Sequence, residues 1–145
     1  MSRLFKLFTA ATILASSAVA QRTWIVDIKM GTGAHFPDVP QAVARAVPGD
    51  QVVIRAGDYS ATTVTKGIVL RPATLSDSVG LQSLVIENVP AHHRFSAKRF
   101  STRRDLRIRN CVGSITLDEV SATLFGGTFR IEDCANVELN CAGAG

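Results

Sequence analysis

Three segments of the chain are copies of one another. Residues 84–89, 106–111 and 129–134 read LVIENV, LRIRNC and FRIEDC, and successive copies begin 22 and 23 residues apart. A repeat of this length is the signature of a solenoid, in which each repeat stacks on its neighbours. Leucine-rich repeats have a similar period, but their longer Leu-rich consensus is absent from this chain.

Short apolar runs divide each repeat into three parts. Between Cys111 and Cys134 we expect strands at 115–117, 124–125 and 129–131, separated by polar or glycine-containing turns. Because alternate residues of a strand point to opposite sides, Phe129 and Ile131 should face inward. Three short strands per repeat predict an all-β fold, a right-handed three-sided parallel β-helix with coils over about 51–145.

Stacked coils place equivalent residues in columns. Asn88, Asn110 and Asp133 form one predicted column at a bend, where asparagine tolerates a left-handed backbone and its amide can donate and accept along the stack. Cys111 and Cys134 form the adjacent column, with Cα atoms about 5 Å apart. That separation suits a disulfide, but two stacked thiols that pack as small apolar side chains fit equally well. With Cys141 the number of cysteines is odd.

The segment before the coils has the pattern of a helix. Phe36, Val39, Val43 and Val47 recur at helical spacing, and Asp38 can cap the helix together with Gln41. Pro48 and Gly49 then end the pattern. We expect a short helix at about 38–47 that covers the first coil, within an N-terminal cap at about 24–50.

The first twenty residues have the pattern of a signal peptide. Arg3 and Lys6 precede an apolar run over 7–20, which ends in Ala18-Val19-Ala20, the small-residue pattern that signal peptidase accepts. We therefore expect a mature chain over 21–145 that is secreted, periplasmic or extracellular and not held in a membrane. Of 16 basic residues 14 remain after cleavage, against 12 acidic ones. The resulting net charge of +2 gives no reason to expect a nucleic-acid partner.

Several motifs together resemble the opening of the pectin-lyase-like β-helix superfamily. They are WIVD at 24–27, GTGAHF at 31–36, QAV at 41–43, PGDQVVI at 48–54 and AGDY at 56–59. The resemblance implies a strand and turn leading into a helix that caps the first coil. The paired aspartates and calcium-binding clusters of the enzymes in that superfamily have no counterpart in this sequence, and Arg107-Ile108-Arg109 is only a faint echo of one catalytic motif. We expect no catalytic residue, no metal ligand and no cofactor.

One stretch of the chain is locally basic. It comprises Arg94, Lys98, Arg99, Arg103, Arg104, Arg107 and Arg109, with Asp105 among them. If Arg99, Arg103 and Arg104 share a face, they can bind an anionic polysaccharide through long-range attraction and direct contact. The alternative is that these are the outward charges of an ordinary solenoid surface.

Two function classes fit these features. The first is a non-catalytic exported solenoid that serves as a surface, carbohydrate-binding or structural module. The second is the N-terminal fragment of a polysaccharide-active lyase, esterase or hydrolase whose catalytic coils are missing. The coil that begins at Cys134 reaches about half its length by Gly145, so we expect an incomplete solenoid that self-associates through an open C-terminal end.

The leader gives a direct prediction. Cleavage should follow Ala20, because the small-residue pattern ends there and polar Gln21 and Arg22 follow. N-terminal sequencing of exported protein should therefore begin at Gln21. An exported chain that still begins at Met1 would contradict the signal peptide.

Overall fold

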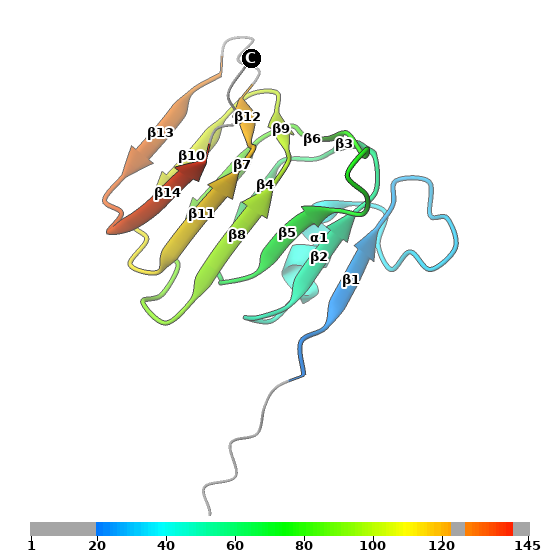
Figure 1. Cartoon of the computed structure of the whole chain (residues 1–145), viewed down its shortest axis with the longest axis horizontal. Coiled ribbons are helices and arrows are strands. Elements are labelled where there is room, and N and C mark those ends of the chain that lie inside the picture. Colours follow the sequence, from blue (N-terminus) through cyan, green and yellow to red (C-terminus); the bar gives the residue numbers. More distant parts are fainter. Residues whose placement is uncertain (1–19, 123–126, 141–145) are drawn as a thin grey trace, which may run out of the picture.

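Short strands follow one another around the axis of a solenoid (Figure 1). This arrangement comes from a computed structural model that describes residues 20–122 and 127–140. The strands are β1 Thr23–Val26, β2 Gln51–Ile54, β3 Gly57–Tyr59, β4 Thr62–Val64, β5 Val69–Pro72, β6 Val79–Leu81, β7 Leu84–Glu87, β8 Arg94–Lys98, β9 Ser101–Thr102, β10 Leu106–Arg109, β11 Ser114–Asp118, β12 Ser121–Ala122, β13 Phe129–Glu132 and β14 Asn136–Asn140, with one helix, α1, at Val39–Arg45.

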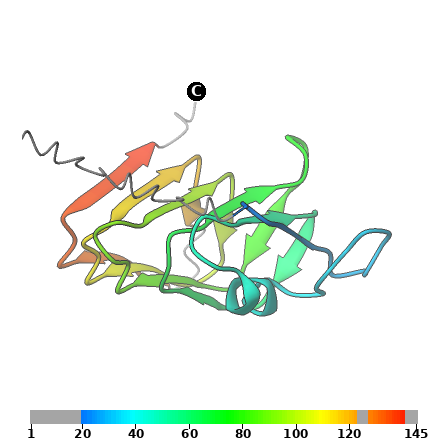
Figure 2. The same cartoon turned by 90° about the horizontal axis from the view of Figure 1, so that it is seen from below.

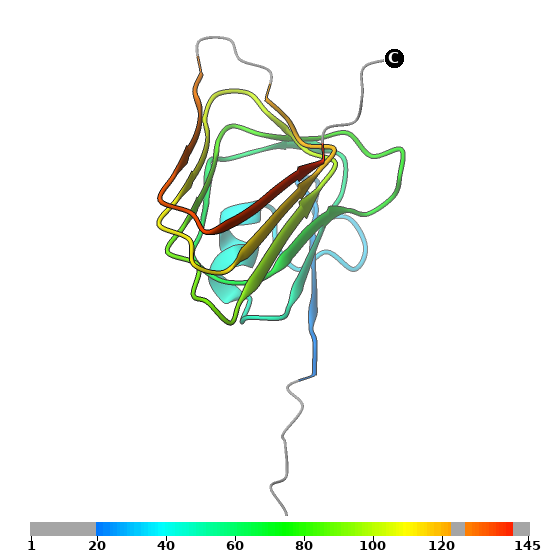
Figure 3. The same ribbon diagram turned by 60° about the vertical axis from the view of Figure 1, so that its left-hand side comes forward.

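The strands form three parallel sheets, one on each side of the solenoid. One sheet has six strands in the order β1-β2-β5-β8-β11-β14, and the other two are β4-β7-β10-β13 and β3-β6-β9-β12. Strands β1 and β2 are neighbours in one sheet; from β2 onward successive strands belong to different sheets, and each sheet gains one strand per coil. In Figure 3, which looks nearly along the axis, the coils lie behind one another. The predicted parallel solenoid with three strands per coil is confirmed.

The register matches the repeat found in the sequence. Leu106 pairs with Leu84 on one side and with Phe129 on the other, and Ile108 pairs with Ile86 and Ile131. The repeated segments are thus equivalent strands of three neighbouring coils. The predicted strand at 124–125 lies outside the described residues.

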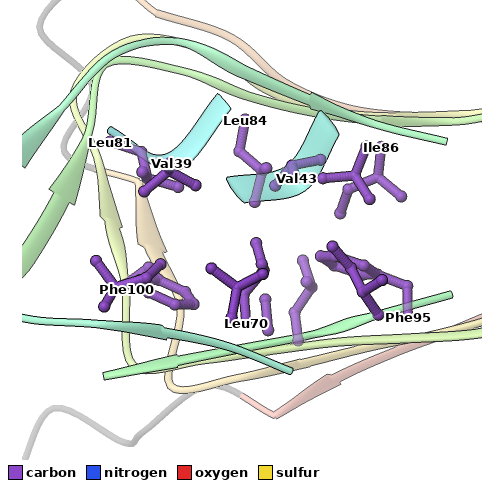
Figure 4. Close-up of a cluster of buried hydrophobic side chains, with 14 of the residues drawn as sticks. Val39, Val43, Leu70, Leu81, Leu84, Ile86, Phe95 and Phe100 are labelled. Carbon is purple, nitrogen blue, oxygen red and sulfur yellow. The ribbon is translucent and has the colours of Figure 1, made fainter. Parts of the chain in front are cut away.

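The inward side chains of all three sheets meet in one core. Leu70 and Phe95 approach from one sheet, Leu84 and Ile86 from the second, and Leu81 and Phe100 from the third sheet and its corners (Figure 4). All of them are essentially inaccessible to solvent. Each such residue contributes about 1.5–3 kcal/mol by its burial, so the columns supply most of the stability of the fold.

Left-handed backbone turns the coils at two corners. Asn88, Asn110 and Asp133 follow equivalent strands with φ of 54°, 52° and 51°. Asparagine and aspartate adopt these angles more readily than most residues. Their side chains are exposed, and the backbone links the column, since Asn110 N–H donates to the Glu132 carbonyl at 3.0 Å. The other corner uses Arg99 and Glu119, with φ of 58° and 54°.

Helix α1 is shorter than the sequence pattern suggested. It begins at Val39 after the cap residue Asp38 and ends at Arg45. The predicted helical face is therefore partly wrong: Val39 and Val43 are buried, but Val47 lies beyond the helix and is 41% exposed. The backbone leaves helical angles at Ala46, whose ψ is 145°, and Pro48 keeps the chain from resuming the helix, because the residue before a proline disfavours helical angles. Ala42 and Ala46 are buried on the same side.

The helix lies at the start of the solenoid, at the opposite end from β13 and β14 (Figures 2 and 3). It contacts β1, β2 and β4, and its buried side chains join the common core. The Lys66 ammonium donates to the carbonyls of Val43 and Ala46 at 2.9 and 2.7 Å. These carbonyls end the helix and lack helical partners, so the lysine satisfies them and complements the helix dipole.

Asp50 joins β1, the end of the helix segment and β2. Its side chain, in a residue only 1% exposed, accepts hydrogen bonds from Arg22 N, Trp24 Nε1 and Val47 N at 2.9–3.0 Å. Burial alone would raise the pKa of Asp50, but these three hydrogen bonds outweigh burial and lower it. The buried carboxylate therefore stays ionised and holds the first coil together.

At the other end of the described chain, apolar side chains remain accessible. Phe129, Ile131 and Leu139 are 43%, 40% and 41% exposed. They belong to the same columns as buried residues of the preceding coils, for example Leu106 and Ile108. Among the described residues, β13 and β14 have a neighbouring coil on one side only.

The geometry of Asp50 predicts how its substitution affects stability. Asp50→Ala leaves three partly buried donors without their acceptor and should lower the free energy of unfolding by about 2–3 kcal/mol. Asp50→Asn keeps one acceptor oxygen and should cost about 1–2 kcal/mol at neutral pH. The exposed pair of Lys98 with Asp118 supplies a control, since Asp118→Asn should cost less than about 1 kcal/mol.

The contribution of Asp50 to stability should also depend on pH. Because the pKa of folded Asp50 lies below its unfolded value of about 3.9, its contribution is complete above that value and disappears as the pH falls through the folded pKa. Denaturant unfolding at pH 7, 4 and 2.5 should show that the difference in free energy of unfolding between the parent and Asp50→Asn becomes smaller as the pH falls. A difference in free energy of unfolding that stays constant over this pH range would contradict the role of the ionised carboxylate.

Candidate functional site

Most charges of the basic stretch are paired between coils. Lys98 pairs with Asp118 at 3.0 Å, and Arg109 Nε donates to Glu87 at 2.6 Å. Arg107 lies 3.4 Å from Asp105 within its own coil. These residues point outward from strands and their partners occupy neighbouring outward positions. The pairs are exposed, so each adds little stability, but each removes a cation from the set available to a ligand.

The structure divides the three arginines of the predicted anion-binding set. Arg99 occupies the corner after β8 and pairs with Glu119 at 3.1 Å. It lines a depression of about 450 Å³ together with Leu75 and Phe100. Arg103 and Arg104 follow β9 and line a different groove. The structure therefore brings Arg103 and Arg104 together and leaves Arg99 apart.

The groove that contains Arg103 and Arg104 lies at the ends of β3, β6 and β9. It has a volume of about 360 Å³ and is open to solvent. We call it the β3–β6–β9 groove, and its lining residues are Asp58, Tyr59, Ser60, Gly80, Leu81, Gln82, Arg103 and Arg104.

Backbone stacking fixes the groove. Gln82 N donates to the Tyr59 carbonyl at 2.9 Å, and Arg103 N donates to the Leu81 carbonyl at 2.9 Å. Arg104 N donates to the Gln82 carbonyl at 3.0 Å. Three successive coils thus present their corners side by side, and residues about 22 positions apart become neighbours.

An ion pair crosses the groove over a glycine. Arg103 Nη2 lies 2.6 Å from Asp58 Oδ2, although the two residues belong to the first and third of the three coils. Gly80 occupies the coil between them, and a Cβ there would lie 2.4 Å from Asp58 Oδ1. The glycine thus leaves room for the carboxylate to extend across its coil toward Arg103. No sequence pattern indicates this pair apart from the glycine inside a short apolar run.

The polar groups of the groove differ in their availability. Within the described residues, Arg104 has no carboxylate at ion-pair distance, and the side chains of Ser60 and Gln82 are exposed. The Tyr59 hydroxyl, in contrast, donates to the Arg55 carbonyl at 2.8 Å. Burial, together with nearby carboxylates, raises the pKa of Tyr59. The groups left for a ligand are therefore Arg104, Gln82, Ser60 and the shared Arg103.

The remaining sequence-predicted residues lie elsewhere. Asn88, Asn110 and Asp133 form the exposed corner column described above. Cys111 is buried, Cys134 is partly exposed, and both are free thiols. Burial raises the pKa of the Cys111 thiol, and the neighbouring Cys134 raises it further. Cys141 lies outside the described residues.

Neither a metal-ligand cluster nor a membrane-spanning helix occurs among the described residues. Over residues 20–122 and 127–140, no three side chains of His, Cys, Asp or Glu gather closely enough to hold a metal ion. In the same part of the chain, no helix has the length and apolar character needed to cross a membrane.

Comparison with known protein families, with curated proteins and with solved structures gives no match to this chain. The geometry and chemistry of the β3–β6–β9 groove therefore carry the functional argument.

Proposed function

We propose that this chain is an exported, non-catalytic β-solenoid that binds an anionic polysaccharide in the β3–β6–β9 groove. The observation that carries the proposal is that Arg103 and Arg104 line one open groove with the side chains of Ser60 and Gln82. Export rests on the predicted signal peptide. The right-handed coil and the kinship with pectin-lyase-like proteins rest on the handedness of parallel crossovers and on the N-terminal motifs.

The groove offers the donors that an acidic sugar requires. A guanidinium group is planar and presents paired N–H donors, which match the two oxygens of a carboxylate. Gln82 and Ser60 can donate to or accept from sugar hydroxyl groups. Because the groove is open and wet, salt screens its charges, and binding should be weak and sensitive to ionic strength.

Asp58 opposes an anionic ligand in this arrangement. Its carboxylate already occupies Arg103, and both side chains are more than half exposed. A ligand carboxylate must either displace Asp58 from Arg103 or bind at Arg104 alone. Removal of the Asp58 charge should therefore strengthen the binding of an acidic ligand and leave the binding of a neutral ligand unchanged.

The first functional prediction concerns retention on immobilised polygalacturonate across a salt series. The variant Arg103→Ala/Arg104→Ala should elute earlier at low salt, which corresponds to a dissociation constant raised roughly tenfold, since the variant removes two charge-assisted contacts. Arg99→Asn should bind nearly as the parent does, because Arg99 pairs with Glu119 outside the groove. Asparagine also suits the left-handed backbone at residue 99.

Arg45→Ala on α1 is a second control, because it removes one positive charge that does not line the groove. If each control, which removes one charge, lost about half as much binding free energy as the double variant, which removes two, only net charge would matter and the groove would be removed from the proposal. A parent that does not bind at all would remove the proposed function.

The second functional prediction concerns Asp58→Asn. It should strengthen retention on polygalacturonate several-fold, because it frees Arg103 and removes a repelling charge. Retention on a neutral polymer such as dextran should not change. Asp77→Asn, which makes the same change in charge outside the groove, serves as the control. Weaker binding by Asp58→Asn would show that the carboxylate positions Arg103 for the ligand and does not compete with it.

A further inference from the structure

Cys111 and Cys134 hold equivalent places on neighbouring coils, directly after the corner residues that follow β10 and β13. Backbone hydrogen bonds on either side fix their register: Asn110 N donates to the Glu132 carbonyl, and Ala135 N donates to the Cys111 carbonyl, both at 3.0 Å. Parallel neighbours in such a ladder are about 4.8 Å apart. This spacing lies within the Cα separation of about 4.4–6.8 Å that a disulfide accepts.

We infer that Cys111 and Cys134 are an oxidisable pair whose disulfide fastens the coil of β13 and β14 to the coil before it. This inference is independent of the β3–β6–β9 groove. It rests on the register of the two cysteines, on their free thiols and on the exposure of the coil that they would fasten.

Forming this bond takes side-chain rotation and a small approach of the two coils, because parallel side chains leave the Cβ atoms about 4.8 Å apart and a disulfide accepts about 3.5–4.5 Å. Cys111 Sγ donates to the Arg109 carbonyl at 3.2 Å, and Cys134 Sγ donates to the Glu132 carbonyl at 3.1 Å. Each sulfur thus bonds to the carbonyl two residues before it, so the two side chains point in similar directions. Rotation about χ1 releases these weak hydrogen bonds and turns the sulfur atoms toward each other.

A disulfide oxidant of the glutathione type completes the chemistry. Cys134 is the more accessible thiol, so its thiolate attacks one sulfur of oxidised glutathione, forms a mixed disulfide and releases one glutathione thiolate. The Cys111 thiolate then attacks the Cys134 sulfur and releases the second glutathione. The two protein thiols lose two electrons and two protons, and one oxidised glutathione becomes two reduced ones. Burial raises the pKa of Cys111, so this second step should accelerate as the pH rises.

A disulfide at this position would stabilise the coil of β13 and β14 against local opening. Every residue of β13 is exposed, whereas β10, its partner in the preceding coil, buries Leu106 and Ile108. A coil with few buried contacts opens more often than the rest of the fold. A bond between Cys111 and Cys134 closes the loop over 112–133 and restricts the opened state.

The test uses the full chain with Cys141→Ser, which leaves only the two stacked thiols. Incubation with oxidised and reduced glutathione in varied ratio should remove the mass of two hydrogen atoms. Peptide mapping without reductant should join Cys111 to Cys134, and dithiothreitol should restore both thiols. Trypsin cleavage after Arg130 in β13 should slow by on the order of tenfold in the oxidised protein.

The control is Cys134→Ser in the same background, which should show one trypsin rate under oxidising and reducing conditions. A glutathione adduct that persists on Cys134 would overturn the inference, because Cys111 would then be out of reach. Two free thiols at every glutathione ratio would overturn it as well. Formation of the bond without slower cleavage after Arg130 would refute its fastening role.

Discussion

Register between parallel coils is the constraint on which the rest of this structure depends. Each inward side chain rests on its equivalents in the coils on either side, as Ile108 does between Ile86 and Ile131. A slip of one residue would turn an entire column from the core to the solvent. The sequence therefore repeats most faithfully at inward positions and at the corners that set the phase of each strand, such as Asn88 and Asn110.

Among the described residues, the first coil has a neighbouring coil on one side only. Asp50 substitutes for part of the missing ladder by accepting three hydrogen bonds, and Asp27 accepts from Lys29 N, Gly31 N and Arg55. Along the outer edge of β1, the Ile25 carbonyl accepts from the N–H groups of His35 and Phe36. The edge of this sheet is thereby paired within the chain, which prevents strand addition there.

The repeat made the parallel solenoid predictable, because the alternation of apolar residues clearly indicates strands β7, β10 and β13. Strands β4 and β8 and the whole row β3, β6, β9 and β12 were not predicted. The strands of that row contain only two or three residues each, and their inward positions include Thr102, which carries no apolar signal. The grouping of Arg99 with Arg103 and Arg104 could not be resolved from the sequence either. A corner lies at Arg99, so residues four apart in the chain face different grooves.

The β3–β6–β9 groove is a consequence of the same register. Stacking places the corner residues of three coils side by side, so Ser60, Gln82 and Arg104 become neighbours without any local sequence motif. Outward charged residues elsewhere form exposed pairs between adjacent coils, as Lys98 does with Asp118 and Arg109 with Glu87. Gly80 interrupts this pattern, because the absence of its side chain lets Asp58 meet Arg103 across two coil spacings. Arg104 is left beside that pair without a carboxylate partner among the described residues, so the charge pattern of the groove follows from one glycine in an outward column.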